Sequence, residues 1–189
     1  MTIKIKICGI TNIEDALNAS LLGADALGFV FVGKSPRYIT PLNTSIIIDA
    51  LPPFISKVGL FVNPSKEEVE DAIRVAKFDL LQFHGDENEE FCNQFNLPYI
   101  KAISVKSEVN LVEYETNYNS ASALLLDTYS EKARGGTGTT VDWNLIPAEE
   151  SKPLIIAGGL NNENITDLLR HTTPYAVDVS GGVEVLKGK

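Results

Sequence analysis

The feature that most constrains the fold of this chain is a regular alternation of short apolar segments with helical patterns along its whole length. Between the apolar segments, apolar side chains recur three and four residues apart, as in Val69, Ala72, Ile73 and Ala76, which is the spacing of an amphipathic helix. Repetition of strand, helix and strand implies parallel pairing, because parallel strands need a crossover connection. The eight predicted strands are Ile3–Ile7, Ala26–Val30, Lys57–Val62, Leu80–Phe83, Tyr99–Ile103, Ala123–Leu126, Leu154–Ala157 and Tyr175–Val179.

Two of the intervening helices carry a capping-box pattern at their expected start, Thr11-x-x-Glu14 and Ser65-x-x-Glu68. In this motif each side chain satisfies a backbone N–H group that the first turn of a helix leaves unpaired. Weaker signals predict a helix after Asn161 or Asn162, with Ile165, Leu168 and Leu169 facing inward, and helices within 86–95 and 106–117.

The length decides between two architectures that both contain parallel strands. Eight units in 189 residues leave about 24 residues each, which is compact for a closed barrel, since about 250 residues are typical. The alternative, a doubly wound open sheet, normally carries a glycine-rich fingerprint after its first strand. Here that strand ends in Cys8-Gly9-Ile10. We therefore predict the α/β class and a compact (β/α)8 TIM barrel, forming a single domain over residues 1–189.

Composition excludes several classes of function. With 16 Lys and Arg against 25 Asp and Glu, the net charge of −9 disfavours nucleic acid as a partner. No apolar run reaches the roughly 18 residues of a membrane span. Two cysteines cannot build a disulfide framework, and a cysteine-based zinc site is improbable. Strand alternation begins at residue 3, so we expect no signal peptide and a cytoplasmic location.

Active sites of parallel barrels lie at the carboxyl ends of the strands, where this chain places Cys8 and Asp127. Strand alternation predicts that Lys4 and Lys6 share the face of Cys8. A cysteine with a pKa of about 8.5 supplies some thiolate near neutrality, and burial favours a protonated carboxyl group. A thiolate base opposite a carboxylic acid forms a workable acid–base couple. From residue type alone, Cys8 also suits a small buried hydrophobe and Asp127 a loop cap.

Paired glycines follow the seventh and eighth predicted strands, as Gly158-Gly159 and Gly181-Gly182. These loops are the usual phosphate site of such barrels. Bare glycine backbone lets N–H groups approach an anion, and a helix starting after each pair would add to the attraction. The alternative is that these glycines only make tight turns.

Three further side chains give weaker signals of a function. Arg37, in the loop after the second strand, suits a carboxylate clamp or a solvated loop position. His84 suits a substrate donor or a strand-end cap, and we favour an auxiliary role. Cys92, within a predicted helix, is expected to serve packing.

Nine short segments, spread in order over nearly the whole chain, carry a further signal. They are Lys6-Ile7-Cys8-Gly9-Ile10-Thr11, Ser35-Pro36-Arg37-Tyr38, Val58-Gly59-Leu60-Phe61-Val62-Asn63, Leu81-Gln82-Phe83-His84-Gly85, Leu126-Asp127, Gly135-Gly136-Thr137-Gly138, Asp142-Trp143, Ala157-Gly158-Gly159-Leu160 and Asp178-Val179-Ser180-Gly181-Gly182-Val183-Glu184. Each segment is a weak signal alone, but together they resemble one family, phosphoribosylanthranilate isomerase, a β/α-barrel enzyme of tryptophan biosynthesis.

The resemblance implies an Amadori rearrangement of N-(5-phosphoribosyl)anthranilate to 1-(2-carboxyphenylamino)-1-deoxyribulose 5-phosphate, without a metal or organic cofactor. It implies that Asp127 is the general acid and Cys8 the general base. It further implies that Arg37 orients the anthranilate part, with His84 and Asp178 nearby. The phosphate would be bound by Gly158, Gly159, Ser180, Gly181 and Gly182, with Gly136 as a further contact. The partner is then a small phosphosugar, and a monomer or homodimer is expected.

The chain departs from the family pattern in three places. Gly181 stands where a second serine is common, so a hydroxyl donor is lost. Thr139 stands where a lysine or arginine is usual, so a basic contact is lost. Only seven residues follow Gly182, which is too few for a complete final helix. We therefore expect the outer faces of the first and eighth strands, including Ile3, Ile5 and Ile7, to lack their usual cover and to expose apolar surface.

Two other functions compete with this interpretation. The analogous isomerase of histidine synthesis would require an aspartate in place of Cys8, and indole-glycerol-phosphate synthase would require lysine and glutamate at strand ends. A non-catalytic barrel that binds a phosphate ligand would bind the substrate without turning it over.

Overall fold

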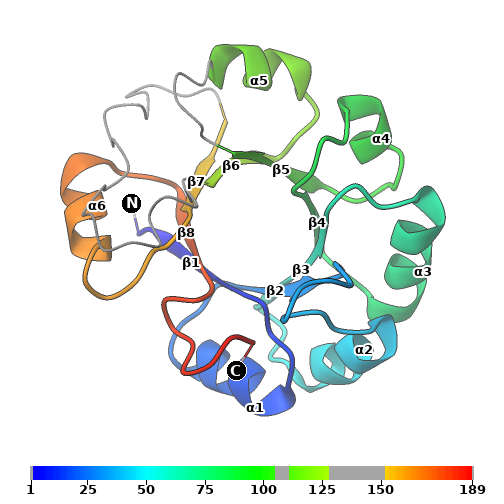
Figure 1. Ribbon diagram of the computed structural model, residues 1–189, viewed down its shortest axis with the longest axis horizontal. Coiled ribbons are helices and arrows are strands. Elements are labelled where there is room, and N and C mark those ends of the chain that lie inside the picture. Colours follow the sequence, from blue (N-terminus) through cyan, green and yellow to red (C-terminus); the bar gives the residue numbers. More distant parts are fainter. Residues whose placement is uncertain (1, 105–110, 128–151, 189) are drawn as a thin grey trace.

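The computed structural model describes residues 2–104, 111–127 and 152–188, and its strands form a closed parallel barrel (Figure 1). Each strand pairs with the next in the chain, and β1 pairs with β8 to close the ring. Every boundary lies within one residue of the sequence prediction, which confirms the eight-stranded barrel. The strands are β1 (Lys4–Cys8), β2 (Ala26–Val30), β3 (Ser56–Phe61), β4 (Leu80–Phe83), β5 (Tyr99–Ser104), β6 (Ala123–Asp127), β7 (Leu154–Ala157) and β8 (Ala176–Val179).

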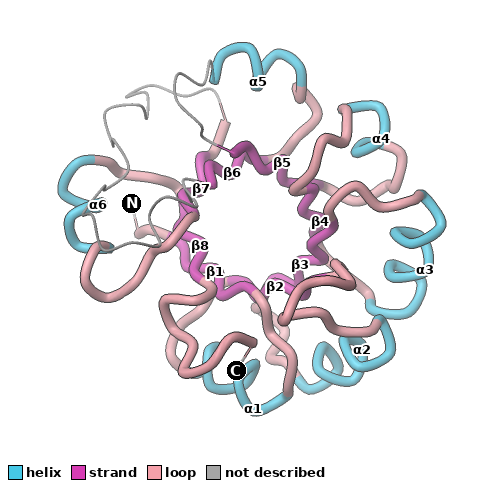
Figure 2. The backbone as a smooth tube through the Cα atoms, in the orientation of Figure 1, coloured by secondary structure: helices cyan, strands magenta, loops and turns pink. Residues whose placement is uncertain are grey.

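The helices lie outside the ring of strands (Figure 2). Within the described part of the chain, none is long and apolar enough to cross a membrane. They are α1 (Ile13–Leu21), α2 (Pro41–Ala50), α3 (Lys66–Ala76), α4 (Glu89–Asn93), α5 (Leu111–Asn117) and α6 (Ile165–His171).

One predicted helix start is confirmed and another is wrong by one residue. Ser65 and Glu68 form the expected capping box of α3. At α1 the cap is Asn12, whose side chain accepts a hydrogen bond from the backbone N–H of Asp15 at 2.8 Å. Thr11 instead donates its hydroxyl to the carbonyl oxygen of Gly188 at 2.9 Å, a contact between distant segments that a local pattern cannot anticipate.

Strand alternation divides the core into two layers. Outward side chains such as Phe29, Phe61 and Phe83 are buried between the strands and the helices. Inward side chains form smaller apolar clusters, one around Leu125 and one that contains Cys8, and the barrel interior also holds buried polar groups. The inward positions at the carboxyl ends of the strands therefore face one space above this interior layer.

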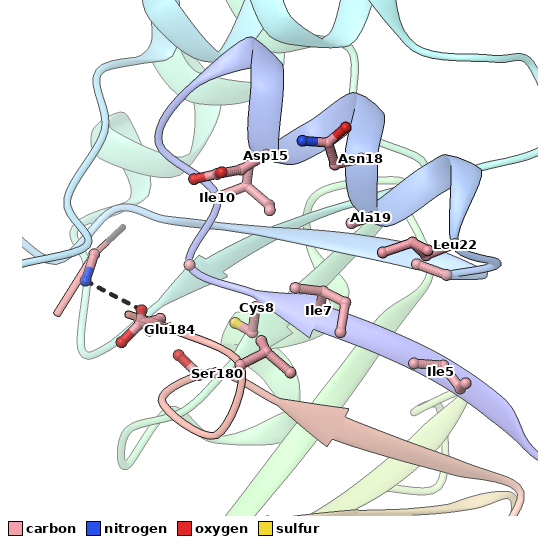
Figure 3. Close-up of a pocket in the computed structure, with 14 residues that line it drawn as sticks. Ile5, Ile7, Cys8, Ile10, Asp15, Asn18, Ala19, Leu22, Ser180 and Glu184 are labelled. Atoms are coloured by element: carbon pink, nitrogen blue, oxygen red, sulfur yellow. Dashed lines mark hydrogen bonds between the residues drawn. The ribbon is translucent and has the colours of Figure 1, made fainter. Parts of the chain in front are cut away.

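The outer face of β1 is incompletely covered, as expected from the sequence. The same expectation for β8 is wrong, because its outward side chains Val177 and Val179 are buried in the main core. The described residues after β8, up to 188, contain no helix. Ile5 is 40 % exposed, and Ile3 and Ile7 are half-buried. Figure 3 shows the resulting groove, of about 330 Å³, between β1, α1 and the segment after β8.

Candidate active site

A cavity of about 800 Å³ opens at the carboxyl ends of the strands, a volume within the usual range for small-molecule sites. The parallel strands bring together side chains that are far apart in the sequence. Ten of the eleven predicted site residues line this cavity, and the eleventh, Gly136, lies outside the described residues. The ten are Cys8, Arg37, His84, Asp127, Gly158, Gly159, Asp178, Ser180, Gly181 and Gly182.

Cys8 ends β1 on the inward face that it shares with Lys6, as alternation predicted for the two residues, and it is 8 % exposed. Its neighbour on β2 is Gly28, and a Cβ atom there would lie 2.7 Å from the Cys8 sulfur. Glycine at this position therefore makes the room that the thiol occupies. Burial raises the pKa of the Cys8 thiol, and the ammonium group of Lys6 opposes that rise.

Lys6 and Asp178 form a buried ion pair beneath the cavity, with 2.8 Å between Nζ and Oδ1. They are register partners on β1 and β8, so the pair forms only when the barrel closes. Burial raises the pKa of the Asp178 carboxyl, and Lys6 acts in the opposite direction. Strand alternation predicted that Lys6 shares the face of Cys8, but no site role was predicted for this lysine. The signal that could have indicated a site role was a charged residue at a strand position on the same face as Cys8.

Asp127 ends β6 and is linked to β4 through His84. The distance from His84 Nε2 to Asp127 Oδ2 is 3.1 Å, and His84 Nδ1 lies 3.1 Å from the amide nitrogen of Gln82. Because an amide nitrogen donates, this arrangement places the imidazole proton on Nε2, from which it is donated to Asp127. The structure therefore brings His84 to Asp127, which supports an auxiliary role for the histidine.

Arg37 lies in the loop after β2, against Gly9, whose φ of +97° suits glycine. Its Nε and Nη2 groups each donate to one carboxylate oxygen of Glu184 at 2.6 Å. This hydrogen bonding raises the pKa of the Arg37 guanidinium. A guanidinium has five N–H donors, and the two bonds to Glu184 use two of them, so further donors remain for another acceptor. No site role was predicted for Glu184 from the sequence, because its partner Arg37 is 147 residues away.

The two paired-glycine turns lie against each other. Gly158 and Gly159 have φ values of +96° and +65°, which other residues rarely adopt. A Cβ atom on Gly182 would collide with the backbone carbonyl of Leu160, so the loop after β8 approaches the loop after β7 too closely for a side chain. This juxtaposition forms a stretch of bare backbone beside the cavity.

The predicted helix start at Gly181-Gly182 is wrong, because the described segment that follows forms only turns. Any anion at this turn would therefore be held by backbone N–H groups without a helix dipole. Gly181 has room for a side chain, since its nearest neighbour would be Arg37 Nη2 at 3.4 Å.

Cys92 is buried in α4 away from the cavity, in agreement with a packing role. Burial raises the pKa of the Cys92 thiol to about 12. Among the described residues, no three His, Cys, Asp or Glu side chains are grouped so that they could hold a metal ion.

A closed β/α barrel with thiol, carboxyl and imidazole groups and a glycine-lined turn around one cavity is the architecture of a barrel enzyme. Comparison with known proteins identifies which one. The family described as N-(5'-phosphoribosyl)anthranilate (PRA) isomerase matches residues 5–189. The N-(5'-phosphoribosyl)anthranilate isomerase of Nitrosospira multiformis is 52 % identical over 188 residues, which cover 100 % of this chain and 90 % of the relative.

Solved structures agree with the sequence comparison. The phosphoribosyl anthranilate isomerase of Thermotoga maritima has a TM-score of 0.90 at 42 % identity, covering 100 % of this chain and 92 % of that one. A second structure of such an isomerase, in complex with reduced 1-(o-carboxyphenylamino)-1-deoxyribulose 5-phosphate, has a TM-score of 0.81 at 38 % identity, with the same coverage. The chain belongs to the N-(5'-phosphoribosyl)anthranilate isomerase family and is an isomerase.

Proposed function

We propose that this chain converts N-(5-phosphoribosyl)anthranilate into 1-(2-carboxyphenylamino)-1-deoxyribulose 5-phosphate, with Asp127 as general acid and Cys8 as general base. The observation that carries the proposal is that both groups line one cavity, together with the glycine turns. The relative solved with a reduced form of this product adds support, because its fold is the same.

The chemistry needs an acid at the ribose ring oxygen and a base at C2 of the sugar. Asp127 donates a proton to the ribose ring oxygen, the bond from that oxygen to C1 breaks, and the ring opens to a protonated Schiff base. The thiolate of Cys8 then removes the proton from C2, and the electron pair moves toward the nitrogen to form an enol. The enol becomes the ketone when C1 takes up a proton and the hydroxyl group on C2 gives one up. Two protons are then gained and two are lost, so the reaction is a net isomerisation. Positioned acids and bases of this kind each contribute about 10²- to 10⁴-fold to a rate.

The remaining residues orient the substrate. His84, hydrogen-bonded to Asp127, holds the carboxyl group in place for the ring oxygen. Arg37 donates from its Nη1 edge to the anthranilate carboxylate in this proposal, while Glu184 holds the other edge of the guanidinium. The phosphate lies at Gly158, Gly159, Ser180, Gly181 and Gly182, with Gly136 as a further contact, and is bound by backbone N–H groups.

The test is turnover of freshly prepared phosphoribosylanthranilate, followed by the loss of its fluorescence. We expect turnover by the purified protein and growth of a tryptophan auxotroph that lacks this isomerase. Binding of the substrate without turnover would contradict the proposal and would support a non-catalytic phosphate-ligand barrel.

Replacing Gly182 with alanine tests the phosphate site. The added methyl group would meet the Leu160 carbonyl group, with its carbon only 2.8 Å away, so the two turns must separate. We expect KM to rise about tenfold or more, since hydrogen bonds to charged groups contribute about 1.5–3 kcal/mol. Competitive inhibition by inorganic phosphate should weaken in parallel.

The matched control is Gly33→Ala, because a Cβ atom at Gly33 meets no other atom within 4 Å. This variant should retain the parental KM and phosphate inhibition. If Gly182→Ala, folded by circular dichroism, also retained both, the phosphate would have to bind elsewhere.

A further inference from the structure

Three buried groups of different chemistry meet at the seam between β1 and β8. The ammonium of Lys6, the carboxyl of Asp178 and the thiol of Cys8 belong to residues that are 3 %, 8 % and 8 % exposed. Lys6 and Cys8 are two residues apart on one strand and therefore share its inward face. The 2.8 Å ion pair with Asp178 keeps the lysine charged inside the barrel.

The glycine at position 28 brings the ammonium and the thiol together. A Cβ atom on Gly28 would lie 2.7 Å from Cys8 Sγ and 3.0 Å from Lys6 Nζ, so both groups occupy the space above this residue. The Lys6 ammonium donates a hydrogen bond to Asp178 Oδ1 at 2.8 Å, and its positive charge lowers the pKa of the neighbouring Cys8 thiol. Lys6 thus lies beside two acidic groups: the carboxylate of Asp178, which is already charged, and the thiol of Cys8, which must lose its proton before it can act as a base.

Burial disfavours a thiolate, because the charged form loses its hydration. The adjacent ammonium is the largest opposing influence on the pKa of Cys8, and Arg37 acts in the same direction. Asp178 has the reverse effect, because its negative charge repels a second one. Asp127 and His84 share the cavity with Cys8, whereas Asp15 on α1 and Glu184 line the outer groove that Cys8 also borders.

We propose that Lys6 is the positioning residue for Cys8, and that its ammonium group, held by Asp178, stabilises the thiolate that acts as the base. The proposal rests on the proposed role of Cys8 and adds the group that makes it a base in a buried site. Lys6 lies beneath the thiol and acts through it.

The test is the ionisation of the thiol itself, measured by thiolate absorbance and by the rate of alkylation with iodoacetamide across pH. Of the two cysteines, Cys92 has a pKa of about 12 and does not interfere at lower pH. Removing the positive charge in Lys6→Met should move the Cys8 titration to higher pH, and each unit lowers the thiolate fraction about tenfold at a fixed lower pH. The ascending limb of kcat/KM against pH should move in the same direction.

A second variant reverses the sign. Asp178→Asn removes the negative charge that repels the thiolate and leaves Lys6 to pair with Cys8 alone, so the titration should move to lower pH. Opposite shifts in the two variants are not expected from loosened packing. Asp178→Asn also tests the proposal on its own if Lys6→Met does not fold.

The matched control is Lys4→Met on the same strand and the same face. Lys4 forms a 2.7 Å ion pair with Asp25, and its side chain is 48 % exposed. Its removal should leave the thiol titration unchanged. The proposal would be overturned if the Cys8 thiol titrated at the same pH in Lys6→Met as in the parent protein. It would also be overturned if Lys6→Met and Asp178→Asn both moved this titration in the same direction. Because thiol ionisation is read without turnover, these results are independent of whether Cys8 proves to be the catalytic base.

Discussion

Replacing Asp127 with asparagine should lower kcat by about 10²- to 10⁴-fold, the range that general acid catalysis contributes. An amide has nearly the same shape as the carboxyl group, and its oxygen can still accept the hydrogen bond from His84 that the carboxylate accepts at 3.1 Å. It has no acidic proton to give to the ribose ring oxygen, so ring opening loses its acid. The measurement is the fluorescence decay of phosphoribosylanthranilate at several substrate concentrations, which separates kcat from KM.

Asp79→Asn is the matched control for this change. Asp79 precedes β4 at the opposite end of the barrel, where it accepts a hydrogen bond from the backbone N–H of Lys57 at 2.9 Å and pairs with the Lys57 side chain. The control should retain kcat with a small loss of stability. Parental kcat in Asp127→Asn would remove this carboxyl group from the mechanism.

Replacing Cys8 with serine should lower kcat over the same range of about 10²- to 10⁴-fold. A serine hydroxyl is smaller than the thiol, so it fits the space above Gly28, and the strand pairing of β1 with β2 is preserved. Its oxygen does not ionise at the pH values where a thiolate forms, so proton removal from C2 loses its base. The measurement is again kcat, together with the unfolding temperature to establish that the barrel is intact.

Cys92→Ser provides the matched control, because it makes the same chemical change at the other cysteine. Cys92 is fully buried in α4, and its thiol lies 4.0 Å from the carbonyl oxygen of Glu87. A hydroxyl there should lower the free energy of unfolding by about 1–3 kcal/mol and leave kcat unchanged. Parental kcat in Cys8→Ser would show that the thiol is not the base.

The strand pattern was predictable because a parallel barrel buries most of its strands on both faces, so most of them are short apolar runs. The first strand instead alternates lysine with isoleucine, and its outer face is incompletely covered. The site residues at the carboxyl ends of the strands were predictable from the same strand pattern, since Cys8, Asp127 and Asp178 lie at or near the ends of predicted strands. Local hydrogen bonding was less predictable. Asn12 rather than Thr11 caps α1, because Thr11 bonds to Gly188, 177 residues away. The described residues after Gly182 contain no helix, although Gly158-Gly159 precedes one.

The sequence by itself determined which side chains point into the barrel and at which end they gather, because alternation and strand order require no knowledge of long-range contacts. The tertiary structure alone decided how those side chains pair. Lys6 meets Asp178 across 172 residues, Arg37 meets Glu184 across 147 and His84 meets Asp127 across 43. Each pair depends on register between strands or on the path of a loop, and these are set when the ring closes and brings β8 beside β1.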